Sequence, residues 1–143
     1  MPKFILDASY AIALSVTTDR YHKLAEKLAD KMEAEGTRLI TTRVIVLEIG
    51  NALAKLRYRS AAVKLLTAIE EDVKIEIVSL SEELYNRGWL LYQERQDKEW
   101  SLTDCISFVI MQERGLTEAL TTDKHFQQAG FIVLLDEELI DAD

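Results

Sequence analysis

The chain has 143 residues, of which 48% are apolar and 29% are charged, and this predicts one globular domain over 1–143. Its net charge of -8 argues against binding nucleic acid through a generally basic surface. The single cysteine, Cys105, allows no internal disulfide and suits a reducing compartment. Only three apolar residues lie between Lys3 and Asp7, too few for a signal peptide, and no stretch is long enough to cross a membrane. We therefore expect a soluble, cytoplasmic protein.

Hydrophobic periodicity and helix-start signals divide the chain into alternating strands and helices. In the first half we expect strands over 3–7 and 38–41, and helices over 8–16, 20–35, 43–57 and 60–72. In the second half we expect strands over 74–79, 118–121 and 131–135, helices over 81–96 and 102–114, and a turn or short helix over 123–126. The acidic tail, 136–143, is expected to be mobile at its end. Strands separated by helices predict a mostly parallel sheet in an α/β sandwich.

The stretch from Trp100 to Met111 predicts a buried helix with a charge at its mouth. Ser101 and Asp104 have the spacing of a capping box, and residues 105–111 are apolar except for Ser107. A helix that is apolar on all sides lies in a core. Asp104 therefore either serves the helix start alone or faces a site.

Four acids stand apart from the solvated majority. Asp7 ends the first strand, Asp104 opens the buried helix, and Asp123 follows the fourth strand, so all three should lie at one edge of the sheet. Glu48 interrupts an otherwise apolar helical run, so we expect it to be buried. Each of the three aspartates has a plain alternative as a helix cap, and Glu48 has one as a buried ion pair. Taken together they predict a site for a hard divalent cation, because clustered carboxylates repel one another.

Other side chains support no different metal or catalytic chemistry. His22 and His125 are far apart in sequence and lack the spacing of zinc ligands. His125, near Asp123, has substrate contact as one interpretation, and a surface position is the favoured one. Cys105 points away from Asp104 around the helix and is interpreted as a core thiol.

Four motifs in order resemble the PIN domain family, and most closely its VapC-type toxin ribonucleases from toxin–antitoxin systems. They are Phe4–Ser9, Val46–Asn51, Ser101–Cys105 and Leu120–Phe126. The resemblance implies a PIN-like three-layer sandwich with a five-stranded parallel sheet, and a homodimer. It implies that Mg²⁺, with Mn²⁺ as a substitute, is held by the catalytic acids Asp7, Glu48, Asp104 and Asp123. Ser9, Asn51 and Thr121 (or its neighbour Thr122) would assist them.

The function that follows is metal-dependent hydrolysis of RNA phosphodiester bonds, with a basic antitoxin protein as partner. Exposed basic residues would hold RNA locally or form an ordinary solvated face; they are Arg20, Lys23, Arg43, Lys55, Arg57, Arg59 and Lys64. The aromatic residues Tyr85, Trp89 and Tyr92 are expected to serve core packing more readily than an aromatic surface. For Tyr10, the sequence allows either stacking on an RNA base or burial under the first helix. The alternatives are a DNA-directed nuclease of the same fold, a phosphotransfer α/β domain and a non-catalytic PIN-like binding module.

Overall fold

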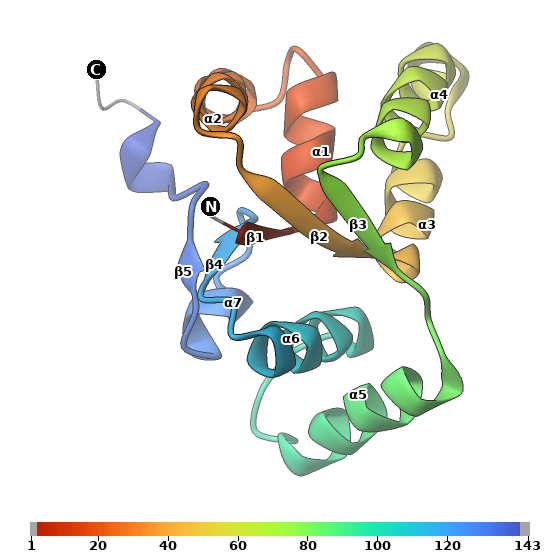
Figure 1. Ribbon diagram of the computed structural model, residues 1–143, viewed down its shortest axis with the longest axis vertical. Coiled ribbons are helices and arrows are strands. Elements are labelled where there is room, and N and C mark those ends of the chain that lie inside the picture. The colour runs from red at the N-terminus through yellow and green to blue at the C-terminus, as the bar shows by residue number, and fades with distance from the viewer. Residues whose placement is uncertain (1–2, 141–143) are drawn as a thin grey trace.

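A five-stranded parallel sheet forms the middle layer of the computed structural model, which describes residues 3–140 (Figure 1). The strand order is β3-β2-β1-β4-β5, and all of the neighbouring strands pair in parallel. The strands are β1 (Lys3–Leu6), β2 (Arg38–Thr42), β3 (Ile75–Val78), β4 (Glu118–Leu120) and β5 (Ile132–Val133). This arrangement confirms the predicted PIN-like three-layer fold.

Helices cover both faces of the sheet. One face carries α1 (Ala8–Ser15), α2 (His22–Glu35), α3 (Arg43–Ala52) and α4 (Leu56–Glu71). The other carries α5 (Glu82–Glu94), α6 (Leu102–Arg114) and α7 (His125–Gln128). A short 3₁₀ turn, Glu137–Leu139, follows β5. Figure 1 shows α5 and α6 together on the side of the sheet opposite to α1–α4.

Alternation along the strands builds the two cores. Leu6 and Leu39 pack with α1–α4, whereas their neighbours Ile5 and Ile40 pack with α5–α7. Successive strand residues point to opposite faces, so both faces of a covered parallel sheet must be apolar. Neighbouring apolar residues such as Ile5 and Leu6 meet this requirement on the two faces of β1.

Helix α6 is the buried centre of the second core. Residues 104–111 are all buried, and Phe108 makes edge-to-face contacts with Trp100 and Phe126. The helix begins with the predicted capping box and ends at Gly115, whose φ of 65° is the left-handed conformation that glycine favours. Cys105 is a buried free thiol, as predicted.

Some helix boundaries were predicted wrongly. The helix expected over 43–57 breaks after Ala52, and α4 begins at Leu56, before Ser60. The break folds α4 back, so that Ala62 and Ile69 enter the same core as Ile49 of α3. Helix α2 starts at His22, since the Asp19 carboxylate accepts a 2.8 Å hydrogen bond from the Tyr21 N–H in the turn before it.

The aromatic side chains of α5 do not serve the core, so that prediction is wrong. Tyr85, Trp89 and Tyr92 are exposed, and Trp89 stacks on Tyr92 with ring centroids 5.7 Å apart. Helix α5 packs on α6 through its buried residues Leu84 and Gly88 instead. Tyr10 is buried, so its ring is not available to stack on a base. Burial also raises its pKa to about 12.

Within the described part of the chain, no helix combines the length and the apolar character that crossing a membrane requires. The expectation for the end of the acidic tail falls on residues 141–143, outside the described range.

Candidate active site

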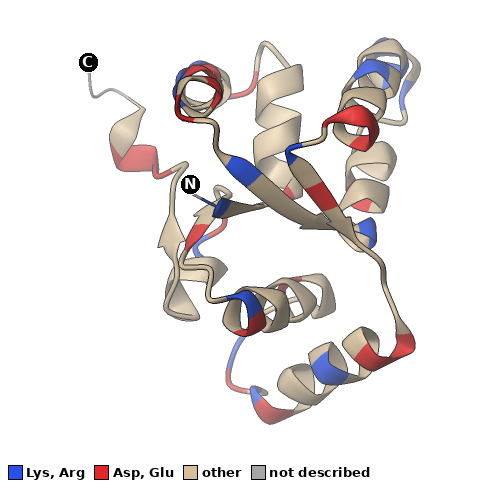
Figure 2. Ribbon diagram, viewed as in Figure 1, with Lys and Arg blue, Asp and Glu red and all other residues tan. Residues whose placement is uncertain are grey.

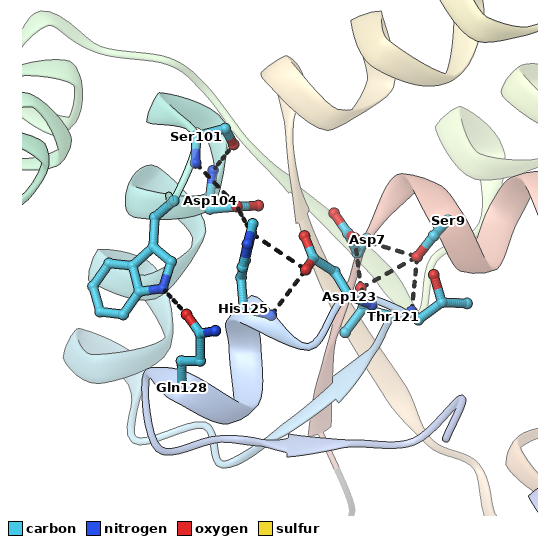
Figure 3. A network of polar contacts seen from close by, with 10 residues as sticks. Asp7, Ser9, Ser101, Asp104, Thr121, Asp123, His125 and Gln128 are labelled. Atoms are coloured by element: carbon cyan, nitrogen blue, oxygen red, sulfur yellow. Dashed lines mark hydrogen bonds and ion pairs between the residues drawn. The ribbon is translucent and has the colours of Figure 1, made fainter. Parts of the chain in front are cut away.

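Three acids meet at the point where the order in which the chain adds strands to the sheet changes sides. From the central strand β1 the chain adds β2 and β3 on one side, whereas β4 and β5 lie on the other. Ligands of parallel sheets bind beyond the carboxyl ends of the strands at such a switch point. Asp7 directly follows β1, and Asp123 follows β4, its neighbour. Asp104 reaches the same point from the first turn of α6, and Figure 3 shows the three carboxylates converging.

Hydrogen bonds fix the Asp7 carboxylate. Thr121 Oγ1 donates to Asp7 Oδ2 at 2.7 Å, and Ser9 Oγ lies 3.3 Å from the same oxygen. Ser9 also contacts Thr121 Oγ1 at 3.2 Å and accepts from the Thr122 N–H at 3.0 Å. Of the two candidate threonines, Thr121 therefore contacts the acid through its side chain, and Thr122 contributes its backbone.

The pKa of Asp7 is raised to about 6. Burial is the largest cause, the hydrogen bond from Thr121 opposes it, and the negative charges of Asp104 and Asp123 add to the rise. Neighbouring acids raise the pKa in this way because each charge disfavours the next. A bound cation would reverse the effect by favouring the carboxylate form.

Asp104 serves both the helix start and the cluster. Its backbone N–H donates to Ser101 Oγ at 3.0 Å, and its Oδ2 accepts from the Ser101 N–H at 3.1 Å. The residue is only 8% exposed. Burial raises its pKa, the Ser101 N–H lowers it, and the charge of Asp123 raises it further. The capping box thus fixes the carboxylate's orientation toward the other acids.

Asp123 is oriented by the backbone of the turn that follows β4. Its Oδ1 accepts the N–H of His125 at 2.8 Å, and its own N–H donates to Thr121 Oγ1 at 3.0 Å. The His125 Nδ1 atom lies 3.2 Å from Asp104 Oδ2 and 3.3 Å from Asp123 Oδ1. His125 is therefore part of the site, and interpreting it as a surface residue was wrong. Its position two residues after Asp123 was the one available signal.

The prediction that Glu48 is buried is also wrong. Glu48 is exposed, as is its neighbour Leu47, which is 60% exposed. The pKa of Glu48 is nevertheless raised. Partial shielding from solvent is the largest cause, and the negative charges of Asp7 and Asp104 add to it. Glu48 thus lies at the rim of the cluster. Asn51, one turn later, is exposed and makes no hydrogen bond to the acids among the described residues.

Basic residues lie on exposed surfaces outside the acidic cluster (Asp7, Glu48, Asp104 and Asp123). Figure 2 shows Lys and Arg along α4. Arg43 pairs with Glu70, and Arg59 donates to the Ala54 carbonyl at 2.7 Å. Lys55, Arg57 and Lys64 are exposed as well.

The donor set suits a hard divalent cation. Asp104, Asp123 and His125 each offer a ligand atom, and the three atoms lie within 4.8 Å of one another. Most donors are carboxylate oxygens, the ligands of Mg²⁺ and Mn²⁺, and no cysteine takes part. Carboxylates at the switch point of a parallel sheet place the molecule among α/β proteins with an acidic cluster that could hold a divalent cation.

Sequence comparison names the class more closely. The chain belongs to the PIN domain family, whose model matches residues 4–132. It is 24% identical over 132 residues to the 23S rRNA-specific endonuclease VapC20 of Mycobacterium tuberculosis, and the match covers 92% of this chain and 98% of that protein.

Solved structures agree on the fold. The crystal structure of M. tuberculosis VapC20, described as a Sarcin-Ricin loop cleaving toxin, matches with a TM-score of 0.78 at 23% identity and covers 90% of this chain and 96% of that one. VapBC2 from Rickettsia felis, bound to a DNA fragment from their promoter, matches with a TM-score of 0.65 at 10% identity, over 92% and 96% of the two chains.

Proposed function

We propose that this chain is a divalent-metal-dependent endoribonuclease and the toxin of a toxin–antitoxin pair. The observation that carries the proposal is the convergence of Asp7, Asp104 and Asp123, with the pKa of Asp7 raised to about 6, in a chain of the PIN domain family. The curated relative VapC20 is named as an endonuclease of 23S rRNA, which supports RNA as the substrate class.

The residues divide into ligands and supports. Asp7 and Asp104 would hold Mg²⁺ or Mn²⁺, and Glu48 and Asp123 would complete the pocket directly or through water. Such a cation supplies positive charge that orients a phosphodiester, favours loss of a proton from an attacking water and stabilises the leaving oxygen.

The chain's own hydrogen bonds prepare the site. Thr121 and Ser9 hold the Asp7 carboxylate, the Ser101 N–H holds that of Asp104, and the His125 N–H holds that of Asp123. Preorganised oxygens avoid reorganisation when the substrate binds, and this is the main contribution a protein makes to such a reaction. Asn51 would reach the substrate from α3 if RNA follows the rim past Glu48.

An RNA digestion series tests the proposal. The full chain is incubated with RNA in Mg²⁺, Mn²⁺ or chelator, beside Asp7→Asn, Asp104→Asn and a control, Asp30→Asn, which removes an exposed acid of α2. We expect metal-dependent cleavage by the native chain and the control, and none by the two site variants with intact melting transitions. Full activity of Asp104→Asn would contradict the assignment.

An acidic toxin suits a basic partner. The net charge of -8 leaves the surface acidic beyond the cluster, so a basic antitoxin segment would be steered toward it. The VapBC2 neighbour, a pair of proteins by its name, supports a partnered state. A small basic reading frame beside the gene, whose product blocks RNA cleavage, is the expected observation. We also propose a homodimer, which sedimentation of the purified chain tests.

A further inference from the structure

His125 places one nitrogen against two acids. Its Nδ1 atom faces Asp104 Oδ2 and Asp123 Oδ1, which come from α6 and from the turn after β4 (Figure 3). An imidazole nitrogen carries at most one proton, so a single N–H cannot point squarely at both oxygens. The arrangement also suits an unprotonated Nδ1 atom whose lone pair binds the same cation as the two carboxylates.

The spacing fits that second arrangement. Six ligands at about 2.1 Å from a common ion place adjacent donor atoms about 3 Å apart. The two nitrogen–oxygen distances, 3.2 and 3.3 Å, are close to that spacing, and all three donor atoms lie within 4.8 Å of one another. Neighbouring oxygens remain available, because each carboxylate has a second oxygen.

The imidazole is also held in place. The His125 backbone N–H donates a hydrogen bond to Asp123 Oδ1. The next residue, Phe126, is fully buried, and its ring centroid lies 4.9 Å from that of Phe108 in α6. The His125 side chain is 31% exposed, so it lines the site wall and does not extend into solvent. A side chain fixed in this way is positioned as a ligand must be.

We propose that His125 is a nitrogen ligand of the divalent cation and that it shifts the site's preference from Mg²⁺ toward first-row transition ions such as Mn²⁺ and Co²⁺. Imidazole nitrogen adds affinity for these ions in the order Mn²⁺ below Co²⁺, whereas Mg²⁺ prefers oxygen. The inference rests on the proposed function for the cation site, and it deepens that function by naming a metal-selecting residue.

Pulsed electron paramagnetic resonance of the Mn²⁺-loaded, untagged chain tests the ligand directly. We expect modulation from a coordinated ¹⁴N nucleus in the native chain and its loss in His125→Gln. The matched control is His22→Gln, which changes the chain's other histidine; His22 Nδ1 lies 2.8 Å from the Ala13 carbonyl oxygen on the opposite face of the sheet. No ¹⁴N modulation in the native chain, or its persistence in His125→Gln, would overturn the proposal.

Calorimetric titrations separate ligation from mere positioning. In His125→Gln, Co²⁺ should bind about 10- to 100-fold more weakly, whereas Mg²⁺ affinity should change by less than about threefold. His125→Asn, which like His125→Gln offers an amide oxygen but on a shorter side chain, should also retain Mg²⁺ affinity without ¹⁴N modulation. Equal losses for both ions would reduce His125 to a positioning residue and overturn the inference. Absent RNA cleavage beside an intact ¹⁴N signal would count against the proposed function alone.

Discussion

Thr121 donates a 2.7 Å hydrogen bond to the Asp7 carboxylate across 114 positions of sequence, and it simultaneously accepts the N–H of Asp123. One fully buried hydroxyl therefore links the acid after β1 to the acid after β4. Because its donated bond stabilises the charged form, it holds the pKa of Asp7 below the value that burial alone would give.

Removing that hydroxyl should destabilise the protein. Thr121→Val keeps the shape of the side chain but removes the 2.7 Å hydrogen bond to the Asp7 carboxylate and leaves the Asp123 N–H without its partner, a loss of about 1–3 kcal/mol in the free energy of unfolding. Urea denaturation at pH 7 measures it. Thr121→Ser, which retains the hydroxyl, should lose less than half as much; equal losses would show that packing, and not the hydrogen bond, matters.

Asp7 should weaken the metal-free fold at neutral pH. Its pKa of about 6 in the folded state lies above its ordinary value of 3.8, so the folded state binds more protons between these values and stability falls as the pH rises through this range. Asp7→Asn should therefore be more stable than the native chain at pH 8 in chelator, by at most about 3 kcal/mol, and equally stable below pH 4.

Thermal melting across pH 4–8 measures that difference, and saturating Mg²⁺ supplies the second comparison. The ion should raise the melting temperature of the native chain more than that of Asp7→Asn, because a ligand that binds only the folded state stabilises it. A native chain that is the more stable of the two at pH 8 without metal would contradict the raised pKa of Asp7.

Glu48 should matter for activity and hardly for stability. It is exposed, so Glu48→Gln should change the free energy of unfolding by less than about 0.5 kcal/mol, while RNA cleavage falls about 10- to 100-fold if the carboxylate completes the cation pocket. Glu71→Gln, an exposed change at the end of α4, is the control. Undiminished cleavage by Glu48→Gln would place it outside the site.

Two helical glycines provide a paired test of packing. A Cβ at Gly88 of α5 would lie 2.6 Å from Ile106 Cγ1 and 3.4 Å from Ile106 Cα in α6, so Gly88→Ala should cost about 1–3 kcal/mol. At Gly50 of α3 the new Cβ would lie 3.5 Å from Leu66 Cδ1, an ordinary contact, and alanine's higher helix propensity should stabilise by up to about 1 kcal/mol. Urea denaturation of the two variants measures whether the free energy of unfolding falls for Gly88→Ala and rises for Gly50→Ala.

Much of this architecture follows from local signals in the sequence. The alternation of Ile5 with Leu6 across β1 and the Ser101–Asp104 capping box both act within a few residues, so pattern and propensity predict them. The same holds for Asp7 and Asp123, since acids placed just after parallel strands must lie at one edge of the sheet.

The predictions from sequence were wrong where tertiary contacts determine the burial or the neighbours of a residue. The apolar run around Glu48 suggested burial, yet a helix lying on a sheet keeps a solvent side, and Leu47 is on it too. For His125 a surface position was favoured over substrate contact, but its neighbour in the fold is Asp104, 21 positions earlier. Leu53 marks the break after α3, which no proline or glycine announces; Gly50 lies within the helix.

The linkage of Asp7 to Thr121 also has a consequence during protein synthesis. The first acid is made at the start of translation, but its hydroxyl partner and Asp123 are added more than a hundred residues later. Until β4 has emerged and paired with β1, a nascent chain therefore carries an incomplete acidic cluster. The acidic cluster of such a chain is therefore completed only when most of the chain has been translated.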